Sequence, residues 1–254
     1  MSLTVSASRP AESTHWYSRN GEPMYTVLGN NGKERATTLR DARKLDLVPS
    51  VTTILNVAAK PALTQWLQRQ VLLSALTLPR IPDETEDQYI ERILQDSKEQ
   101  GRMAADAGTD LHSSIQSFYE GKPYSSDHNK HVEGCHTAIQ ELFGPKEWKC
   151  ESSFAHGIGF GGKVDMHCDD VVLDIKTKEF AHKEEVKPYD DHLMQLAAYR
   201  VGLGKPAARC ANVFVSRSHP GTTFIYEWTD DDLIKGWSMF VSLLDFWQLK
   251  TGHQ

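Results

Sequence analysis

The stretch from residue 161 to 178, GGKVDMHCDDVVLDIKTK, constrains the fold more than any other part of the sequence. It contains two short runs typical of β-strands, residues 163–168 and 171–176. The pair Asp169-Asp170 separates them, and aspartate favours turns because its side chain can hydrogen-bond to the nearby backbone. The stretch therefore predicts a β-hairpin with a two-residue turn.

Pairing across this turn places like charges opposite each other. Asp165 is expected to face Asp174, and Lys163 to face Lys176. Because side chains alternate along a strand, one face of the hairpin should be ionic and the other should be core. The ionic face should hold Lys163, Asp165, His167, Val172, Asp174 and Lys176, and the core face Val164, Met166, Cys168, Val171, Leu173 and Ile175. Facing carboxylates raise the pKa of one of them unless a cation lies between them, so the hairpin predicts a site for a hard divalent cation.

Composition indicates an ordinary globular chain. Its 254 residues, 39% hydrophobic and 24% charged, suit one elaborated domain or two small ones. No apolar run approaches the roughly 20 residues of a membrane helix, so no membrane partner is expected. The start, MSLTVSASRPAESTHW, lacks an apolar signal core, so we expect a cytoplasmic protein. The net charge of -6 argues mildly against a protein that coats nucleic acid, although local basic stripes matter more than the total.

Cysteine spacing excludes two classes of small fold. Cys135, Cys150, Cys168 and Cys210 stand far apart without a CxxC pair, so neither a zinc ribbon nor a disulfide framework is indicated. We expect reduced, buried thiols.

The remaining elements are predicted to surround the central hairpin. Asn31-Gly32 indicates an earlier β-hairpin, and Ser50 is a suitable N-cap for a helix that follows it. Further helices are expected at about 62–77, 83–103, 111–119, 130–143, 190–202 and 230–250, and further strands at about 148–154, 211–216 and 222–228. Aromatic residues of the early helices, Trp66 and Tyr89, could stack on nucleic-acid bases, although plain core packing is the commoner use of such residues.

Two glycine motifs before the hairpin lack the context that a nucleotide site needs. Residues 157–162 match GxGxxG, and residues 157–163 match the GxxxxGK part of a P-loop. Both motifs must follow a strand and open a helix, whereas these glycines open a strand, and Val164 replaces the Ser or Thr that would bind magnesium. No nucleotide cofactor is expected. His128, His131 and His136 lack a metal-site spacing and are interpreted as a solvated helix surface.

Four motifs in order resemble the PD-(D/E)xK nuclease superfamily, and specifically its RecB-like branch. The motifs are the histidine helix with Gly108-Thr-Asp-Leu-His112, the strand with Gly162-Lys-Val-Asp165, the strand with Asp174-Ile-Lys176, and the helix from Gln195 to Tyr199. Each is weak alone, but their joint occurrence is specific. The stretch from Val48 to Thr52 and the tryptophan-bearing last helix look closest to the mitochondrial genome maintenance exonuclease and similar phage-encoded exonucleases.

The resemblance implies a fold, an activity and a set of site residues. The fold would be α/β (α+β), with a restriction-endonuclease-like mixed central sheet flanked by helices, an added N-terminal β-hairpin and a helical region. Asp165, Asp174, His112 and the backbone carbonyl of Ile175 would bind Mg2+ or Mn2+. Lys176 would orient the attacking water, Gln195 would hold the site in register, and Tyr199 would support Gln195. Iron-sulfur members carry a cysteine ahead of the histidine helix, and none precedes His112, so no cluster is expected.

Domain organisation and substrate follow from the same resemblance. Residues 1–47 would form an extension, and residues 48–250 one nuclease domain with a helical part at 48–145 and a catalytic core at 146–250. The substrate would be single-stranded DNA or DNA ends, with helicase, polymerase or recombination proteins as partners in a bacterial or phage-infected cell. Candidate DNA contacts are Lys60, Trp66, Lys178 and Arg217, and Glu151 is a candidate accessory carboxylate. Lys60 could equally be a solvated loop lysine, and Glu151 a surface residue of an edge strand.

Three functions remain open at this point. An exonuclease would thread a free end through the early helices, a structure-selective endonuclease would not need one, and a non-catalytic DNA-binding module could use the same fold. Asp174→Ala is expected to abolish turnover and, without metal, to stabilise the fold slightly because a carboxylate repulsion is removed.

Overall fold

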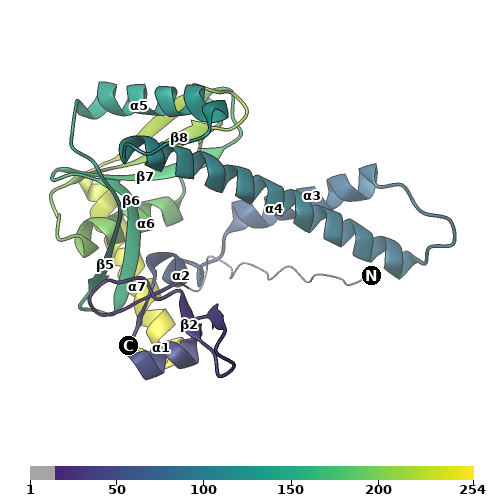
Figure 1. Ribbon diagram of the computed structural model, residues 1–254, viewed down its shortest axis with the longest axis horizontal. Coiled ribbons are helices and arrows are strands. Elements are labelled where there is room, and N and C mark those ends of the chain that lie inside the picture. Colours follow the sequence, from purple (N-terminus) through teal and green to yellow (C-terminus); the bar gives the residue numbers. More distant parts are fainter. Residues whose placement is uncertain (1–14) are drawn as a thin grey trace.

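A five-stranded mixed sheet forms the centre of the computed structural model, which describes residues 15–254 (Figure 1). Its strands lie side by side in chain order: β5 (Lys149–His156), β6 (Phe160–His167), β7 (Val171–Lys178), β8 (Arg209–Ser216) and β9 (Thr223–Trp228). All neighbours are antiparallel except β7 and β8, which are parallel. The expectation that the chain starts without an export signal falls mainly on residues before 15, outside the described range.

Helices cover both faces of the sheet. The parallel connection from β7 to β8 passes through α6 (Asp190–Gly202), which packs with α2 (Val51–Leu55) and α7 (Asp230–Thr251) around one apolar core. On the other face, α4 (Glu86–Tyr119) and α5 (Asn129–Phe143) pack around a second core. The 3-10 turns η2 (Ser126–His128) and η3 (Lys183–Glu185) lie in connecting segments. The predicted restriction-endonuclease-like mixed sheet flanked by helices is confirmed.

The N-terminal extension contains the predicted hairpin. Its strands are β2 (Thr26–Leu28) and β3 (Glu34–Ala36), and Gly32 in the turn has φ 70°, a left-handed conformation that favours glycine. The chain continues through α1 (Leu39–Leu45), and β1 (Trp16–Tyr17) pairs with β4 (Val48–Pro49) directly before α2. Ser50 caps α2 as expected, because its hydroxyl accepts a hydrogen bond from the Thr53 N–H.

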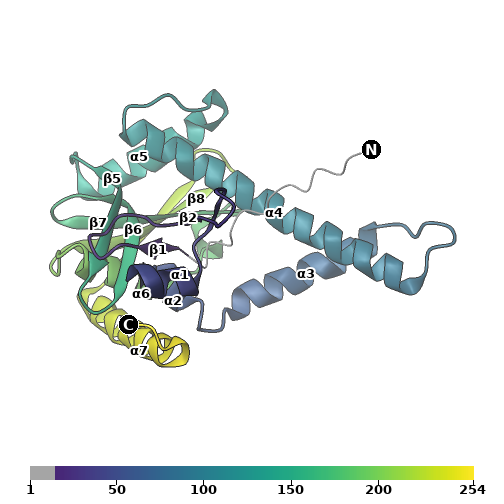
Figure 2. The same ribbon diagram turned by 60° about the horizontal axis from the view of Figure 1, so that its bottom comes forward.

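A long helical arm replaces two shorter helices expected from the sequence. The 34-residue helix α4 runs unbroken through Gly108, where the sequence predicted a boundary between helices at 83–103 and 111–119. Gly108 serves close packing instead, because a Cβ there would lie 2.7 Å from the Thr177 hydroxyl oxygen on β7. The first half of α4 and α3 (Pro61–Thr77) extend together away from the sheet in both views (Figure 1 and Figure 2).

The predicted division of the hairpin into one ionic and one core face is wrong in two respects. Val172, placed on the ionic face, belongs to the core under α6, so that face is also covered. Val164 and Met166 should share a face, yet Val164 packs in the α6 core and Met166 in the α4 core. The alternation therefore breaks at Asp165, across from Glu151, which has φ 53°.

One expectation about exposed side chains is also corrected. His131 is buried, and His136 packs beside Phe118 and Tyr119, so these histidines are not a solvated helix surface. Helix α5 instead lies against α4. Tyr89 donates its hydroxyl hydrogen to the Leu78 carbonyl at 2.9 Å, which makes it a structural residue of the arm. Within residues 15–254, no helix combines the length and apolarity needed to cross a bilayer.

Candidate active site

The candidate site lies where strands β6 and β7 separate. The hairpin has the predicted register, with Met166 opposite Leu173 and His167 opposite Val172, but the ladder ends before the two aspartates. In the gap, the Ile175 N–H donates to the Asp165 carboxylate at 2.7 Å. Because the N–H and C=O of one strand residue point to the same side, the Ile175 carbonyl is directed into the same gap. The side chain of Asp165 thus takes the place of the next ladder bond.

Helix α4 brings His112 to Asp165. Its Nε2 atom lies 3.1 Å from Asp165 Oδ2. Burial opposes the charged form of both groups, but their mutual attraction is stronger, so the pKa of His112 is raised and that of Asp165 is lowered. Both shifts favour the imidazolium and carboxylate forms of the pair.

Asp174 is the most enclosed carboxylate of the site, with 1% of its surface exposed. Its oxygens accept hydrogen bonds from Lys176 Nζ at 2.9 Å and Asn212 Nδ2 at 2.8 Å. Burial raises the pKa of Asp174 to about 6, Lys176 acts against this rise, and the charge of Asp165 adds to it. Burial and the charge of Asp165 therefore outweigh the effect of Lys176 and favour the protonated form of Asp174.

Asn212 and Trp228 were missed by sequence reasoning. The indole N–H of Trp228 donates to Asn212 Oδ1 at 2.8 Å, and Asn212 turns its amide N–H towards Asp174. The parallel pairing of β7 with β8 sets Asn212 beside Asp174. A signal existed in the sequence, because Asn212 is a lone amide within the apolar run ANVFV, but its partner depends on which strand pairs with β7.

A chain of hydrogen bonds leads from Asp174 into α6. Lys176 Nζ donates to Gln195 Oε1 at 2.9 Å, and Gln195 Nε2 donates to the Tyr199 hydroxyl at 2.9 Å. The i,i+4 spacing of Gln195 and Tyr199 places both on one helical face. Tyr199 fits against Gly162 of β6, where a Cβ would lie 2.9 Å from the Tyr199 ring. Burial, followed by the charges of Asp165 and Asp174, raises the pKa of Tyr199 well above its usual value, so it stays neutral.

The donor set suits a divalent metal ion in its chemistry. Among the described residues, no three histidine, cysteine or acidic side chains converge into a preformed metal cage. Asp165 and Asp174 nevertheless supply the carboxylate oxygens that Mg2+ and Mn2+ prefer, and the Ile175 carbonyl adds a neutral oxygen. In this structure His112 forms an ion pair with Asp165, and Lys176 forms one with Asp174. The raised pKa of Asp174 is the observation that favours additional positive charge at this place.

Two of the candidate DNA contacts, Lys178 and Arg217, are bound to neighbouring groups of the protein. Lys178 Nζ lies 4.5 Å from the centre of the Tyr189 ring and donates to the Lys187 carbonyl at 3.3 Å. Arg217 donates to the Ala104 carbonyl of α4 and lies 3.6 Å from Glu179. Both cations are therefore held by neighbouring groups.

Lys60 and Trp66 lie at the base of the arm. Lys60 Nζ is 4.0 Å from Asp191 Oδ2 at the start of α6. Trp66 is 37% exposed and faces Gly101 of α4, where a Cβ would lie 3.8 Å from the indole ring. Glu151, the candidate accessory carboxylate, forms an ion pair with Lys163 on the neighbouring strand.

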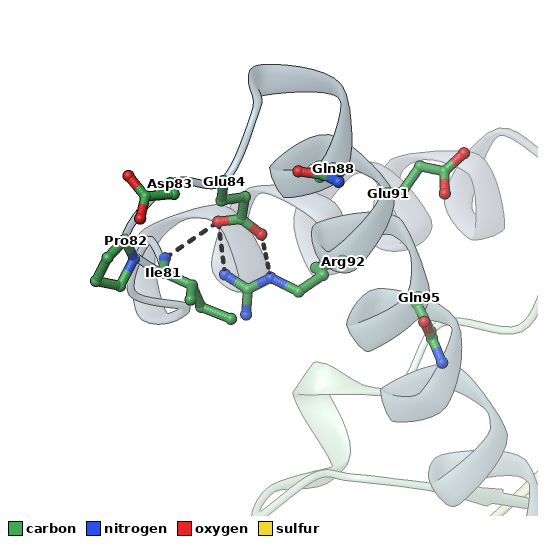
Figure 3. A pocket seen from close by; sticks show the side chains of 8 residues that line it. All are labelled: Ile81, Pro82, Asp83, Glu84, Gln88, Glu91, Arg92 and Gln95. Atoms are coloured by element: carbon green, nitrogen blue, oxygen red, sulfur yellow. Dashed lines mark hydrogen bonds and ion pairs between the residues drawn. The ribbon is translucent and has the colours of Figure 1, made fainter.

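A hollow at the far end of the arm is separate from this site. Figure 3 shows its lining residues, Ile81, Pro82, Asp83, Glu84, Gln88, Glu91, Arg92 and Gln95. The Glu84 carboxylate accepts hydrogen bonds from the Arg92 guanidinium, at 3.0 Å from Nη2, and from the Ile81 N–H at 3.1 Å. Through these bonds Glu84 joins the loop before α4 to the helix, so its role is structural.

Comparison with known proteins adds distant structural neighbours. No family model and no curated protein matches the sequence. Among solved structures, a presumed exonuclease from Eubacterium rectale is 12% identical, with a TM-score of 0.42 over 58% of this chain and 69% of that protein. An alkaline exonuclease from Laribacter hongkongensis is 13% identical, with a TM-score of 0.35 over 57% of this chain and 81% of that protein.

Proposed function

We propose that this protein is a Mg2+- or Mn2+-dependent deoxyribonuclease of the PD-(D/E)xK superfamily that hydrolyses phosphodiester bonds. The observation that carries the proposal is the position of Lys176. Its Nζ atom contacts both the Asp174 carboxylate and Gln195 at 2.9 Å, beside the gap that holds Asp165. Two carboxylates alone would support metal binding, whereas an adjacent buried cation also supplies positive charge for a developing phosphorane.

Asp165, Asp174, His112 and the Ile175 carbonyl are the groups that would hold the metal ion. A bound divalent ion polarises the scissile phosphate and lowers the pKa of an attacking water. His112 would bind the ion as the neutral imidazole, so the charge of the ion would take the place of the imidazolium charge beside Asp165, while Lys176 would keep its contact with Asp174.

The chain's own residues position the reaction. Lys176 stays protonated, because Asp174 and Asp165 raise its pKa against the effect of burial, so it can donate hydrogen bonds to a water and to phosphate oxygens. Gln195 limits the directions in which Lys176 can point, and Tyr199 fixes the Gln195 amide through its nitrogen. Asn212 holds one oxygen of Asp174, which leaves the carboxylate a defined orientation.

The finer assignment is an exonuclease of the RecB-like branch, closest to the mitochondrial genome maintenance exonuclease and its phage-encoded relatives. We propose single-stranded DNA or DNA ends as substrate, in replication, recombination or repair within a bacterial or phage-infected cell. Proteins that unwind or process DNA, such as a helicase, polymerase or recombination protein, would then be partners. The four sequence motifs support this assignment, because His112, Asp165, Asp174, Lys176, Gln195 and Tyr199 converge in space.

Digestion of three labelled DNA forms tests the proposal. Linear single strands, linear duplexes and closed circles are incubated with Mg2+ or Mn2+, and the products are separated on a gel. We expect loss of linear DNA from its ends and intact circles. Cleavage of circles would show an endonuclease, and the absence of any cleavage would indicate a DNA-binding module. Lys235→Gln, which changes an exposed lysine of α7, should cut DNA like the unmodified protein and is the control for variants that remove a lysine of the site.

A further inference from the structure

An aromatic group from the N-terminal extension is fixed to strand β6 beside the candidate site. The group consists of His15, Tyr17 and Tyr25. Tyr17 is buried and fits against Gly161, where a Cβ would lie 3.0 Å from Tyr17 carbons. Its hydroxyl lies 2.8 Å from that of Tyr25, and the His15 ring stacks on Tyr25 with ring centres 4.3 Å apart. The extension therefore carries aromatic rings to the strand that bears Asp165.

Only part of this group is explained by core packing. Tyr17 is 2% exposed, as expected of a residue that anchors the extension. His15 and Tyr25 are half-buried and belong to none of the apolar cores formed by the described residues. His15 and Tyr25 are thus partly exposed aromatic residues that lie outside these cores.

Lys163 lies on β6 between Gly161, which Tyr17 contacts, and Asp165. Lys163 shares a face of β6 with Gly161, about 6.6 Å away along the strand, because the alternation breaks only after it, at Asp165. Lys163 also lies close enough to Tyr25 and Asp165 to interact electrostatically with both. The Lys163 side chain is 36% exposed, and its ion pair with Glu151 is the type of partly exposed pair that contributes little to stability.

Glu151 adopts a backbone conformation that is costly in a strand. It has φ 53° and lies across from Asp165, at the rung where the β5 and β6 ladder is interrupted. A non-glycine residue in this region is strained and persists only where the surroundings enforce it. The Glu151 carboxylate forms its ion pair with Lys163 from this position.

We propose that His15, Tyr25 and Lys163 form a subsite for the unpaired nucleotide next to the scissile phosphate, with its base on the aromatic rings and its phosphate on Lys163. Base stacking on aromatic side chains tolerates any sequence, and a base can reach such rings only when it is not paired within a duplex. The subsite rests on the proposed nuclease function and deepens it, because it would make the enzyme select single-stranded ends.

Binding of a fluorescently labelled single-stranded oligonucleotide, measured by anisotropy without added metal, tests the subsite independently of cleavage. We expect Tyr25→Ala to weaken binding by about 5- to 150-fold, the range for loss of one stacked base, and Tyr25→Phe to bind like the unmodified protein. Lys163→Gln should weaken binding and reduce the salt slope by about 0.7, as expected for one lost phosphate contact. Phe246→Ala removes an exposed aromatic ring from α7 and should change nothing.

Oligonucleotides with one abasic position, moved stepwise along the strand, distinguish stacking from a structural effect. In the unmodified protein one position should weaken binding, and Tyr25→Ala should be insensitive to it. The subsite is rejected if Tyr25→Ala and Lys163→Gln bind as tightly as the unmodified protein, or if Tyr25→Phe loses as much as Tyr25→Ala. A protein that binds single strands through Tyr25 and Lys163 yet cuts no DNA would contradict the nuclease function and leave the subsite standing.

Discussion

The Nζ atom of Lys176 lies 2.9 Å from the side-chain oxygen of Gln195, a residue of the helix that connects the two parallel strands. The same atom contacts Asp174, so strand and helix hold the lysine from two sides. A lysine on a flexible stem becomes a directed cation only when its rotamers are restricted in this way.

Lys176→Gln should reduce kcat by at least about 100-fold, because a preorganised cation at the developing charge is removed. The neutral amide can still reach Gln195, so the fold should be retained. Single-turnover cleavage of a labelled single strand measures the effect, with Lys235→Gln as control. Equal rates in both variants would exclude Lys176 from the reaction.

Asp174→Ala should abolish turnover and lower the free energy of unfolding by about 2–4 kcal/mol, because it leaves the buried Lys176 without its anionic partner and the Asn212 amide without an acceptor. This expectation differs from the slight stabilisation predicted from the sequence, which considered only the repulsion by Asp165. Asp174→Asn keeps a hydrogen-bond acceptor and should be less destabilised while remaining inactive. Urea unfolding without metal compares the two variants. If Asp174→Ala is more stable than the unmodified protein, repulsion between the two carboxylates outweighs the lost contacts.

Mn2+ should raise the melting temperature of the unmodified protein, since an ion that binds only the folded state at about 100 times its Kd adds about 2.7 kcal/mol. Asp165→Asn should lose this response because a carboxylate ligand becomes a neutral amide. A chelator should reverse the rise. Thermal unfolding with increasing Mn2+ measures it, and an equal response in both proteins would place the ion elsewhere.

His192 should make the protein less stable in mild acid. Burial, followed by the charges of Lys176 and Lys178, lowers the pKa of His192 to about 3, whereas an unfolded histidine has a pKa of about 6.5. As the pH falls below about 6.5, only the unfolded chain gains this proton, so stability decreases until about pH 3. The loss between about pH 7.5 and 5 should be about 2 kcal/mol. His192→Gln should remove this part of the pH dependence in urea unfolding, and unchanged curves would refute it.

Gly108→Ala should destabilise the protein by about 1–3 kcal/mol, because its methyl group would lie 2.7 Å from the Thr177 hydroxyl oxygen. Thr177→Ala removes that oxygen, so the double variant should regain most of the loss. Thermal unfolding of the two single variants and the double variant gives the coupling. If the double variant is no more stable than Gly108→Ala, the close approach of α4 to β7 is not what requires the glycine.

Local patterns predicted much of the fold. The turn at Asp169-Asp170 and the alternation of the flanking runs placed Met166 opposite Leu173, as observed. Asn31-Gly32 marked a hairpin, and Ser50 marked the start of a helix. Each of these features depends on residues within a few positions of one another, where backbone geometry and hydrogen bonding leave few choices.

The sequence by itself thus determined the register of the central hairpin and brought Asp165 and Asp174 to its two strands. Only the tertiary structure decided that the ladder opens before them, that Asn212 and Lys176 hold Asp174, and that α6 covers the face expected to be ionic. It also placed Gly108 inside a continuous α4, where Thr177 lies against that residue. The physical reason is that side-chain periodicity is set along the chain, whereas the partner of a buried charge is set by segments that meet only when the sheet is assembled.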